Sequence, residues 1–219
     1  MVPVSNEGDG RDVSTGSRPR RRAVPLPFVA VLVAAALVAG YVLGRPGYPL
    51  DNSADAGFLR DMSAHHAQAV DMSMTVLETA EDPTLRTVAY DIATTQQSQI
   101  GRMQGWLVQW GLGARGAQPP MAWMAGHGHG DAPERMPGLA TEEDMDALAA
   151  AEGEEAEIQY LELMIEHHQG GAEMADAAAS LAREPMVTGF ARGMAGAQRS
   201  EIELMTRMLE ERGVRPGTS

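Results

Sequence analysis

Residues 58–73, FLRDMSAHHAQAVDMS, and residues 160–175, YLELMIEHHQGGAEMA, contain the same phrase, M-x-x-H-H-x-x-x-x-x-M. Its members are Met62, His65, His66 and Met72 in the first copy, and Met164, His167, His168 and Met174 in the second. Every member is displaced by the same 102 residues, so the two copies form an internal repeat. On an α-helix that turns about 100° per residue, the members of one copy fall on one face. Each copy therefore predicts a helix face with two imidazoles and two thioethers.

The repeat extends well beyond the phrase. An ungapped comparison of 58–113 with 160–215 gives 15 identities in 56 pairs. Pro83 and Pro185 each follow an acidic residue, which is typical of a helix that starts directly after another one ends. The sequence thus predicts two helical hairpins that pack as an all-α four-helix bundle over 55–213. A pseudo-two-fold arrangement of the hairpins would bring the two His-His helices together, but the sequence leaves open whether they meet. A loop at 114–140 joins the hairpins, and Thr141 begins a TEED capping box for a short helix.

Composition excludes several kinds of site. The 219 residues include no cysteine, which rules out disulfides, thiolate zinc sites, iron–sulfur clusters and cysteine nucleophiles. After Arg45 the chain has 11 arginines, no lysine and 27 acidic residues. Such a domain repels nucleic acid and attracts cations. The acidic runs at 142–146 and 152–157 are expected to be solvent-exposed.

The N-terminal residues predict export. Residues 1–24 are polar and end in a cluster of arginines, which is typical of a disordered tail. Residues 25–44 contain no charged residue and are long enough for a transmembrane helix or signal anchor, and 45–54 form a linker. Arginines before this stretch and acidic sequence after it place the tail in the cytoplasm and the domain outside a single-pass membrane anchor. The alternative is a signal peptide that is cleaved to release a secreted domain.

The two phrases resemble those of the bacterial DUF305 family, whose domain is described as ferritin-like. The resemblance covers roughly residues 55–212. It implies an exported or membrane-anchored protein, and some members look like periplasmic copper-binding proteins with Met and His ligands. Carried over by position, it points to the eight phrase residues as metal ligands. GlyGly at 170–171 departs from the usual pattern and is expected to affect packing more than chemistry.

A metal site has to be weighed against an ordinary core. A lone histidine or methionine on an apolar helix face is mostly a core residue. Two identical His-His phrases favour ligands, because each imidazole buried without a partner costs about 1 to 3 kcal/mol. Thioether with imidazole favours copper as Cu(I), while imidazole alone also accepts Cu(II) or zinc. The two histidines of a pair diverge by about 100°, so either one central site or two related sites are expected.

A di-iron centre is disfavoured. Such a centre needs Glu-x-x-His on two helices, and Met62 and Met164 occupy the positions that should hold glutamate. Asp61 lies one turn before His65 and is a candidate to orient it, although the equivalent Leu163 cannot do the same.

The loop at 114–140 offers an accessory set of donors: Met121, Met124, His127, His129 and Met136. It is interpreted either as a flexible metal-capturing tract or as a glycine-rich connector. No nucleophile triad, phosphate loop or nucleotide fingerprint is present, so the sequence favours binding over catalysis. The leading hypothesis is copper storage, buffering or delivery. The alternatives are a helical interaction module without metal and, third, a redox enzyme that uses the same metal.

Overall fold

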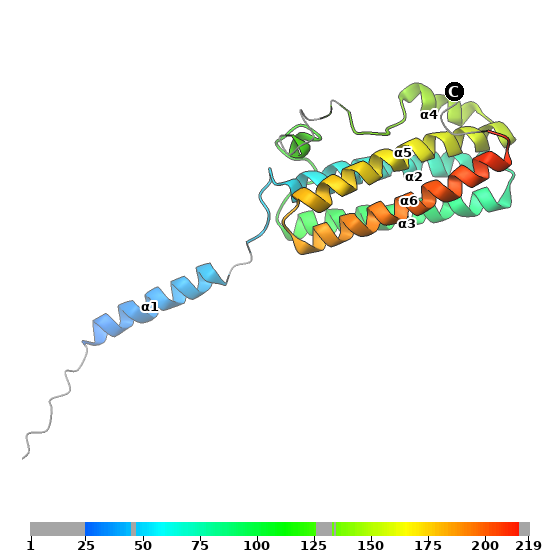
Figure 1. The fold of residues 1–219 in the computed structure, drawn as a ribbon. Coiled ribbons are helices and arrows are strands. Elements are labelled where there is room, and N and C mark those ends of the chain that lie inside the picture. Colours follow the sequence, from blue (N-terminus) through cyan, green and yellow to red (C-terminus); the bar gives the residue numbers. More distant parts are fainter. Residues whose placement is uncertain (1–24, 45–46, 126–132, 134, 215–219) are drawn as a thin grey trace, which may run out of the picture. The chain divides into compact units, whose positions relative to one another are not determined.

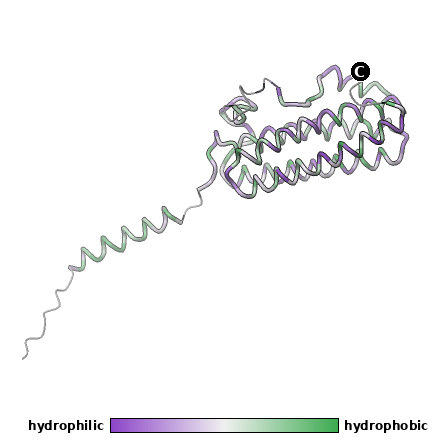
Figure 2. The backbone as a smooth tube through the Cα atoms, in the orientation of Figure 1, coloured by the Kyte–Doolittle hydropathy of each residue, from purple (hydrophilic) through white to green (hydrophobic). Residues whose placement is uncertain are grey.

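The computed structural model describes residues 25–44, 47–125, 133 and 135–214. The chain separates into two compact units, Met1–Gly47 and Tyr48–Ser219, each treated by itself below. Helix α1 (Leu26–Leu43) belongs to the first unit, and Figure 2 shows it as almost uniformly hydrophobic.

No helix in the described ranges is both long and apolar enough to cross a membrane. The transmembrane helix predicted at 25–44 is therefore not confirmed. The tail at 1–24 lies outside the described residues, as do positions 45 and 46 of the linker.

The second unit is built from two helical hairpins. Its helices are α2 (Ala54–Thr79), α3 (Pro83–Gln109), α4 (Glu142–Ala150), α5 (Gly153–Leu181) and α6 (Pro185–Glu211), with the short 3-10 helix η1 (Ala122–Met124). Helix α2 packs against α3, α5 packs against α6, and the hairpins join through α2 and α5 (Figure 1). The all-α class is confirmed for the described residues. The ferritin-like form is not confirmed. In that part of the chain, α3 and α6 do not pack against each other as closely as α2 and α5 do.

The predicted helix boundaries rest on local chemistry. The Asp82 carboxylate accepts hydrogen bonds from two N–H groups at the start of α3, and Pro83 occupies the first turn. Gly111 and Gly213 follow α3 and α6 with φ of 75° and 78°, a conformation that other residues rarely adopt. Thr141 forms the predicted capping box at the start of α4. These caps explain why both hairpins end where the repeat predicts.

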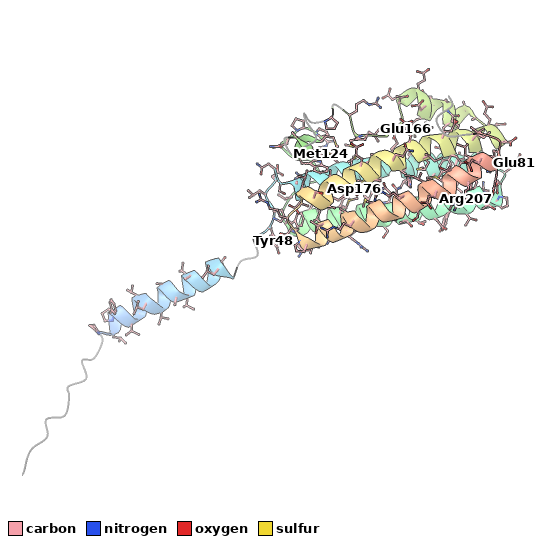
Figure 3. All side chains as sticks on the ribbon, viewed as in Figure 1. Tyr48, Glu81, Met124, Glu166, Asp176 and Arg207 are labelled. Carbon is pink, nitrogen blue, oxygen red and sulfur yellow. The ribbon has the colours of Figure 1, made fainter. Side chains whose placement is uncertain are left out.

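The core has two apolar halves. The first apolar cluster includes Phe58, Leu59, Met62, Met103, Leu107, Met121, Trp123, Met124, Met174, Val187 and Met194. The second apolar cluster includes Met72, Val76, Leu85, Ile92, Leu148, Tyr160, Leu161, Met164, Met205 and Leu209. Along both α2 and α5 the two clusters are separated by the histidine pair. Figure 3 labels Glu166, the residue before His167, near the middle of α5.

Two buried carboxylates join the repeats. Asp55, at the start of α2, accepts hydrogen bonds from the N–H groups of Arg183 and Glu184 at the turn of the other hairpin. Glu157, its equivalent at the start of α5, accepts from Glu81 and Asp82 at the turn of the first hairpin. The exposed position expected for residue 157 is wrong, because two backbone donors and an arginine hold this carboxylate inside.

Replacing Asp55 by alanine should destabilise the protein. The two N–H groups at the α5–α6 turn would lose their acceptor, so we expect the free energy of unfolding to fall by about 1 to 3 kcal/mol. Urea unfolding followed by circular dichroism measures the change. Asp71→Ala, an exposed aspartate on the same helix, is the control and should change stability by less than about 0.5 kcal/mol. Equal effects of the two substitutions would contradict the prediction.

Candidate metal centre

The four histidines of the repeat lie together inside the bundle, and we call them the histidine layer. His65 and His66 come from α2, and His167 and His168 come from α5. Each is at most 1% exposed. The rings of His65 and His167 stack across the α2–α5 interface, with centroids 3.8 Å apart and planes 36° apart. The structure therefore brings the two phrases into direct contact.

Each histidine uses its Nε2 atom as a hydrogen-bond donor. The acceptors are the Pro137 carbonyl for His65 at 2.9 Å, the His65 carbonyl for His167 at 3.0 Å, the Gln99 Oε1 for His66 at 2.6 Å and the Glu201 Oε2 for His168 at 2.9 Å. Because these oxygens only accept, the hydrogen of each ring sits on Nε2. In a neutral ring, the lone pair is therefore on Nδ1.

The four Nδ1 atoms are the unusual feature of the layer. All four are buried, and none has a hydrogen-bond partner in the described residues. A metal-binding histidine commonly presents one ring nitrogen to the ion while its other N–H is held by a carbonyl or carboxylate oxygen. The Nε2 bonds of the layer follow this arrangement. Four buried imidazole nitrogens without partners fit the chemistry of an imidazole-binding ion.

Burial also determines the protonation state of three histidines of the layer. It lowers the pKa of His65 to about 4 and that of His66 to about 3, and a second effect on His66 is the neighbouring His65. Burial and the other histidines hold the pKa of His167 well below its usual value. These three rings are neutral at pH 7, which is the form that ligates metals.

The four phrase methionines flank the layer. Met62 and Met174 belong to the first apolar cluster, and Met72 and Met164 belong to the second. All four are fully buried. Thus a thioether from each helix lies on either side of the histidine layer along the bundle.

Three imidazoles do not converge on one point. Within the described ranges, no group of three or more His, Asp or Glu side chains is placed to hold one ion. An ion bound in the layer therefore needs donors of another type beside the imidazoles, such as thioether sulfur or amide oxygen.

The accessory loop residues divide into two groups. Met121 and Met124 are buried in the first apolar cluster, and Met136 packs against it while partly exposed (Met124 is labelled in Figure 3). Their burial corrects the interpretation of Met121 and Met124 as part of a flexible tract. His127 and His129 lie outside the described residues.

Asp61 does not orient His65. Its Oδ2 accepts hydrogen bonds from the Met121 N–H at 2.7 Å and the Trp123 Nε1–H at 2.8 Å. Burial raises the pKa of this carboxyl group. The expected role of Asp61 is therefore wrong, because its oxygen holds η1 against α2 and the acceptor for His65 is Pro137 instead.

Residues 135–141 form a strap across α2 and α5 that sequence reasoning missed. The Gln68 side chain binds both the N–H and the carbonyl of Ala140. A Cβ atom on Gly170 would lie 2.1 Å from the Pro137 carbonyl oxygen, so only glycine admits the strap there. Gln68 and Gly170 are equivalent positions of the repeat, and their difference was the available indication that one loop crosses the interface.

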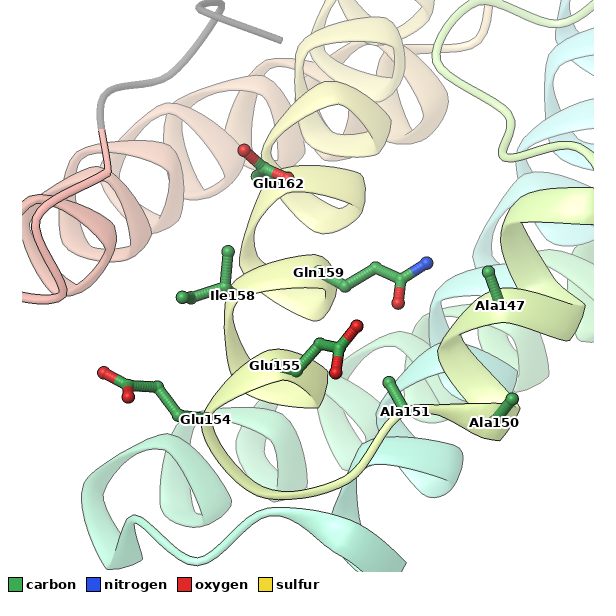
Figure 4. Close-up of a pocket in the computed structure, with 8 residues that line it drawn as sticks. All are labelled: Ala147, Ala150, Ala151, Glu154, Glu155, Ile158, Gln159 and Glu162. Carbon is green, nitrogen blue, oxygen red and sulfur yellow. The ribbon is translucent and has the colours of Figure 1, made fainter.

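A surface hollow elsewhere does not share this chemistry. It measures about 720 Å³ and lies between α4 and α5, where the side chains of Glu155 and Gln159 extend toward Ala151 and Ala147 (Figure 4). Its lining residues include neither histidine nor methionine. The histidine layer is therefore the candidate centre.

Known proteins resemble this chain in both fold and sequence. Residues 55–209 match the model of a family described as "Domain of unknown function (DUF305)". A DUF305 protein from Streptomyces coelicolor is 46% identical, with a TM-score of 0.72 over 78% of this chain and 100% of that chain. A DUF305 fragment from Deinococcus radiodurans is 32% identical, with a TM-score of 0.61 over 76% and 99%. CopM in its Cu(I)-bound form is 25% identical, with a TM-score of 0.55 over 75% and 98%. A search of curated proteins gave no match.

Acid should destabilise the metal-free protein before it protonates most carboxylates. Because burial lowers the pKa of three histidines below the unfolded value of about 6.5, the unfolded state binds more protons as pH falls from about 6.5 toward 4. The free energy of unfolding should therefore decrease over this range, by up to about 1.4 kcal/mol per pH unit for each histidine. Urea unfolding in chelator between pH 7 and 5 measures the slope. His66→Leu should reduce it, and a flat profile in the parent protein would contradict the prediction.

Proposed function

This chain belongs to the DUF305 family, and from that membership and the histidine layer we propose that it binds copper through methionine and histidine outside the cytoplasm. Its role would be the storage, buffering or delivery of the ion. The cargo is the metal itself, and no catalysed reaction is part of the proposal.

The observation that carries the proposal is the set of four buried Nδ1 atoms without hydrogen-bond partners in the described residues. A buried acceptor without a donor costs about 1 to 3 kcal/mol. Both hairpins carry this unfavourable energy at equivalent positions of the repeat. Apolar side chains at these positions would avoid it. A bound cation would compensate for it by accepting the lone pairs.

The identity of the ion follows from the donors. Fully buried thioethers beside neutral imidazoles suit Cu(I), and imidazole nitrogen also accepts Cu(II) and zinc. The related CopM has been described in Cu(I)-, Cu(II)- and Ag-bound forms at 25–27% identity. That relative supports copper over zinc as the ion of this chain.

Export is the second part of the proposal. The Streptomyces coelicolor relative is described as a "putative secreted protein", and the apolar stretch at 25–44 follows a cluster of arginines in this chain. Retention of this stretch as an anchor and its cleavage as a leader both place the bundle outside the cytoplasm.

The interaction module without metal fits the structure less well. Its histidines would have to meet another protein or respond to solvent, yet all four are at most 1% exposed and pack against each other. The interface that the two phrases form lies within one chain. This placement supports a ligand inside the bundle.

Removing thioethers should weaken Cu(I) binding selectively. Met62→Leu and Met174→Leu keep the core volume, so stability should change by less than about 1.5 kcal/mol, while Cu(I) affinity should fall about tenfold or more. Competition with a chromogenic Cu(I) chelator measures the affinity. Met208→Leu removes a buried thioether outside the phrase and is the matched control.

The same titration tests the proposal as a whole. The unmodified protein should bind Cu(I) or Cu(II) at micromolar concentration and more tightly than zinc. Absence of copper binding at that concentration would rule out the proposed function. Equal losses in the control and phrase variants would show that the phrase methionines are packing residues.

A further inference from the structure

Two buried glutamines lie near the histidine layer, one on α3 and one on α6. Gln96 on α3 and Gln198 on α6 are equivalent positions of the repeat, and each is 3% exposed. The Oε1 atom of each side chain is buried and has no hydrogen-bond partner in the described part of the chain. The same orphaned amide oxygen thus occurs in both hairpins.

Their neighbours place both amides at the histidine layer. Gln99 lies one turn after Gln96 and accepts the Nε2–H of His66. Glu201 lies one turn after Gln198 and accepts the Nε2–H of His168. Residues three apart on a helix lie on the same side, so each orphaned amide is adjacent to a histidine partner.

The position of Gln198 is fixed further by Gly171. A Cβ atom on Gly171 would lie 2.5 Å from Oε1 and 2.9 Å from Nε2 of Gln198. Gly171 follows His167 by one helical turn. The amide therefore presses against α5 beside the layer.

An ordinary core would not keep these amides. The clusters on either side of the layer are filled by leucine, methionine and other apolar side chains, whereas each orphaned carbonyl oxygen costs about 1 to 3 kcal/mol. The histidine layer and the two glutamines together contribute six buried polar atoms without hydrogen-bond partners, namely four imidazole nitrogens and two amide oxygens. Such a set is complementary to a cation.

We propose that Gln96 and Gln198 supply amide-oxygen ligands to the metal centre and give the histidine layer its affinity for a divalent ion, Cu(II). This inference rests on the proposed function and adds two ligands and a preference to it. Amide oxygen is a hard donor that suits a divalent ion better than Cu(I), whereas the methionine sulfurs on either side of the layer are soft donors. The Glu201 carboxylate on His168 adds negative charge where the equivalent Gln99 adds none, which also favours higher positive charge.

Leucine substitutions test whether Gln96 and Gln198 are metal ligands or structural residues. In the full-length protein, Gln96→Leu with Gln198→Leu should raise the unfolding temperature of the metal-free state, because two orphaned oxygens are removed. Cu(II) affinity should fall about tenfold or more, while Cu(I) affinity should change by less than about twofold. Competition with Cu(II) and Cu(I) chelators measures the affinities, and electron paramagnetic resonance of the Cu(II) form should change. Gln97→Leu, an exposed neighbour on α3, is the control and should leave all three readouts unchanged.

Each other outcome has a definite meaning. Unchanged Cu(II) affinity and spectrum in the double variant would overturn the assignment and leave the amides as structural residues. Equal losses of Cu(I) and Cu(II) affinity would also overturn it, because a general packing defect would then explain the result. If the leucine variants do not fold, Gln96→Met with Gln198→Met applies the same test, and the ratio of Cu(II) to Cu(I) affinity should fall. An unmodified protein that binds neither ion would overturn the proposed function itself.

Discussion

Burial of four imidazoles between α2 and α5 is the constraint on which the rest of the structure depends. The rings can be buried only because every Nε2–H has an oxygen acceptor. Those acceptors come from α3, from α6, from the backbone of α2 and from the strap, so one polar layer requires all of these elements to be in register. The apolar clusters then fill the bundle on both sides of the layer.

Much of this arrangement could be predicted from the repeat. The constant offset predicted two hairpins and the junctions at Pro83 and Pro185, because local caps and helical periodicity determine these features. It left open whether the two phrases meet, which depends on how the hairpins pack. The contacts of the strap could not be predicted, since they join residues 72 positions apart without any periodic pattern. The difference between Gln68 and Gly170 indicates that the two repeats have different neighbours there, but it does not say which residues contact them. The burial of Glu157 could not be predicted either. A glutamate within an acidic run gives no local indication that two backbone N–H groups of another hairpin will bind it.

The two halves of the site are similar without being identical. His66 binds an amide oxygen and His168 binds a carboxylate, although both acceptors occupy the same repeat position. His65 donates to the strap, whereas His167 donates to the backbone of α2. The duplication gives the two histidine pairs the same spacing. The single connecting loop crosses the α2–α5 interface only once, so His65 and His167 have different neighbours. A bound ion would therefore meet two chemically different half-sites.

The reciprocal hydrogen bonds of Asp55 and Glu157, each to the turn of the other hairpin, bear on the origin of the chain. Each hairpin supplies the acceptor for the turn of the other, and the two interactions are equivalent under the repeat. One hairpin alone would leave its own turn uncapped, but two identical copies would cap each other through a self-complementary interface, as in a symmetric dimer. The present chain is thus consistent with descent from a homodimer of single hairpins that gene fusion made covalent, after which its halves could diverge.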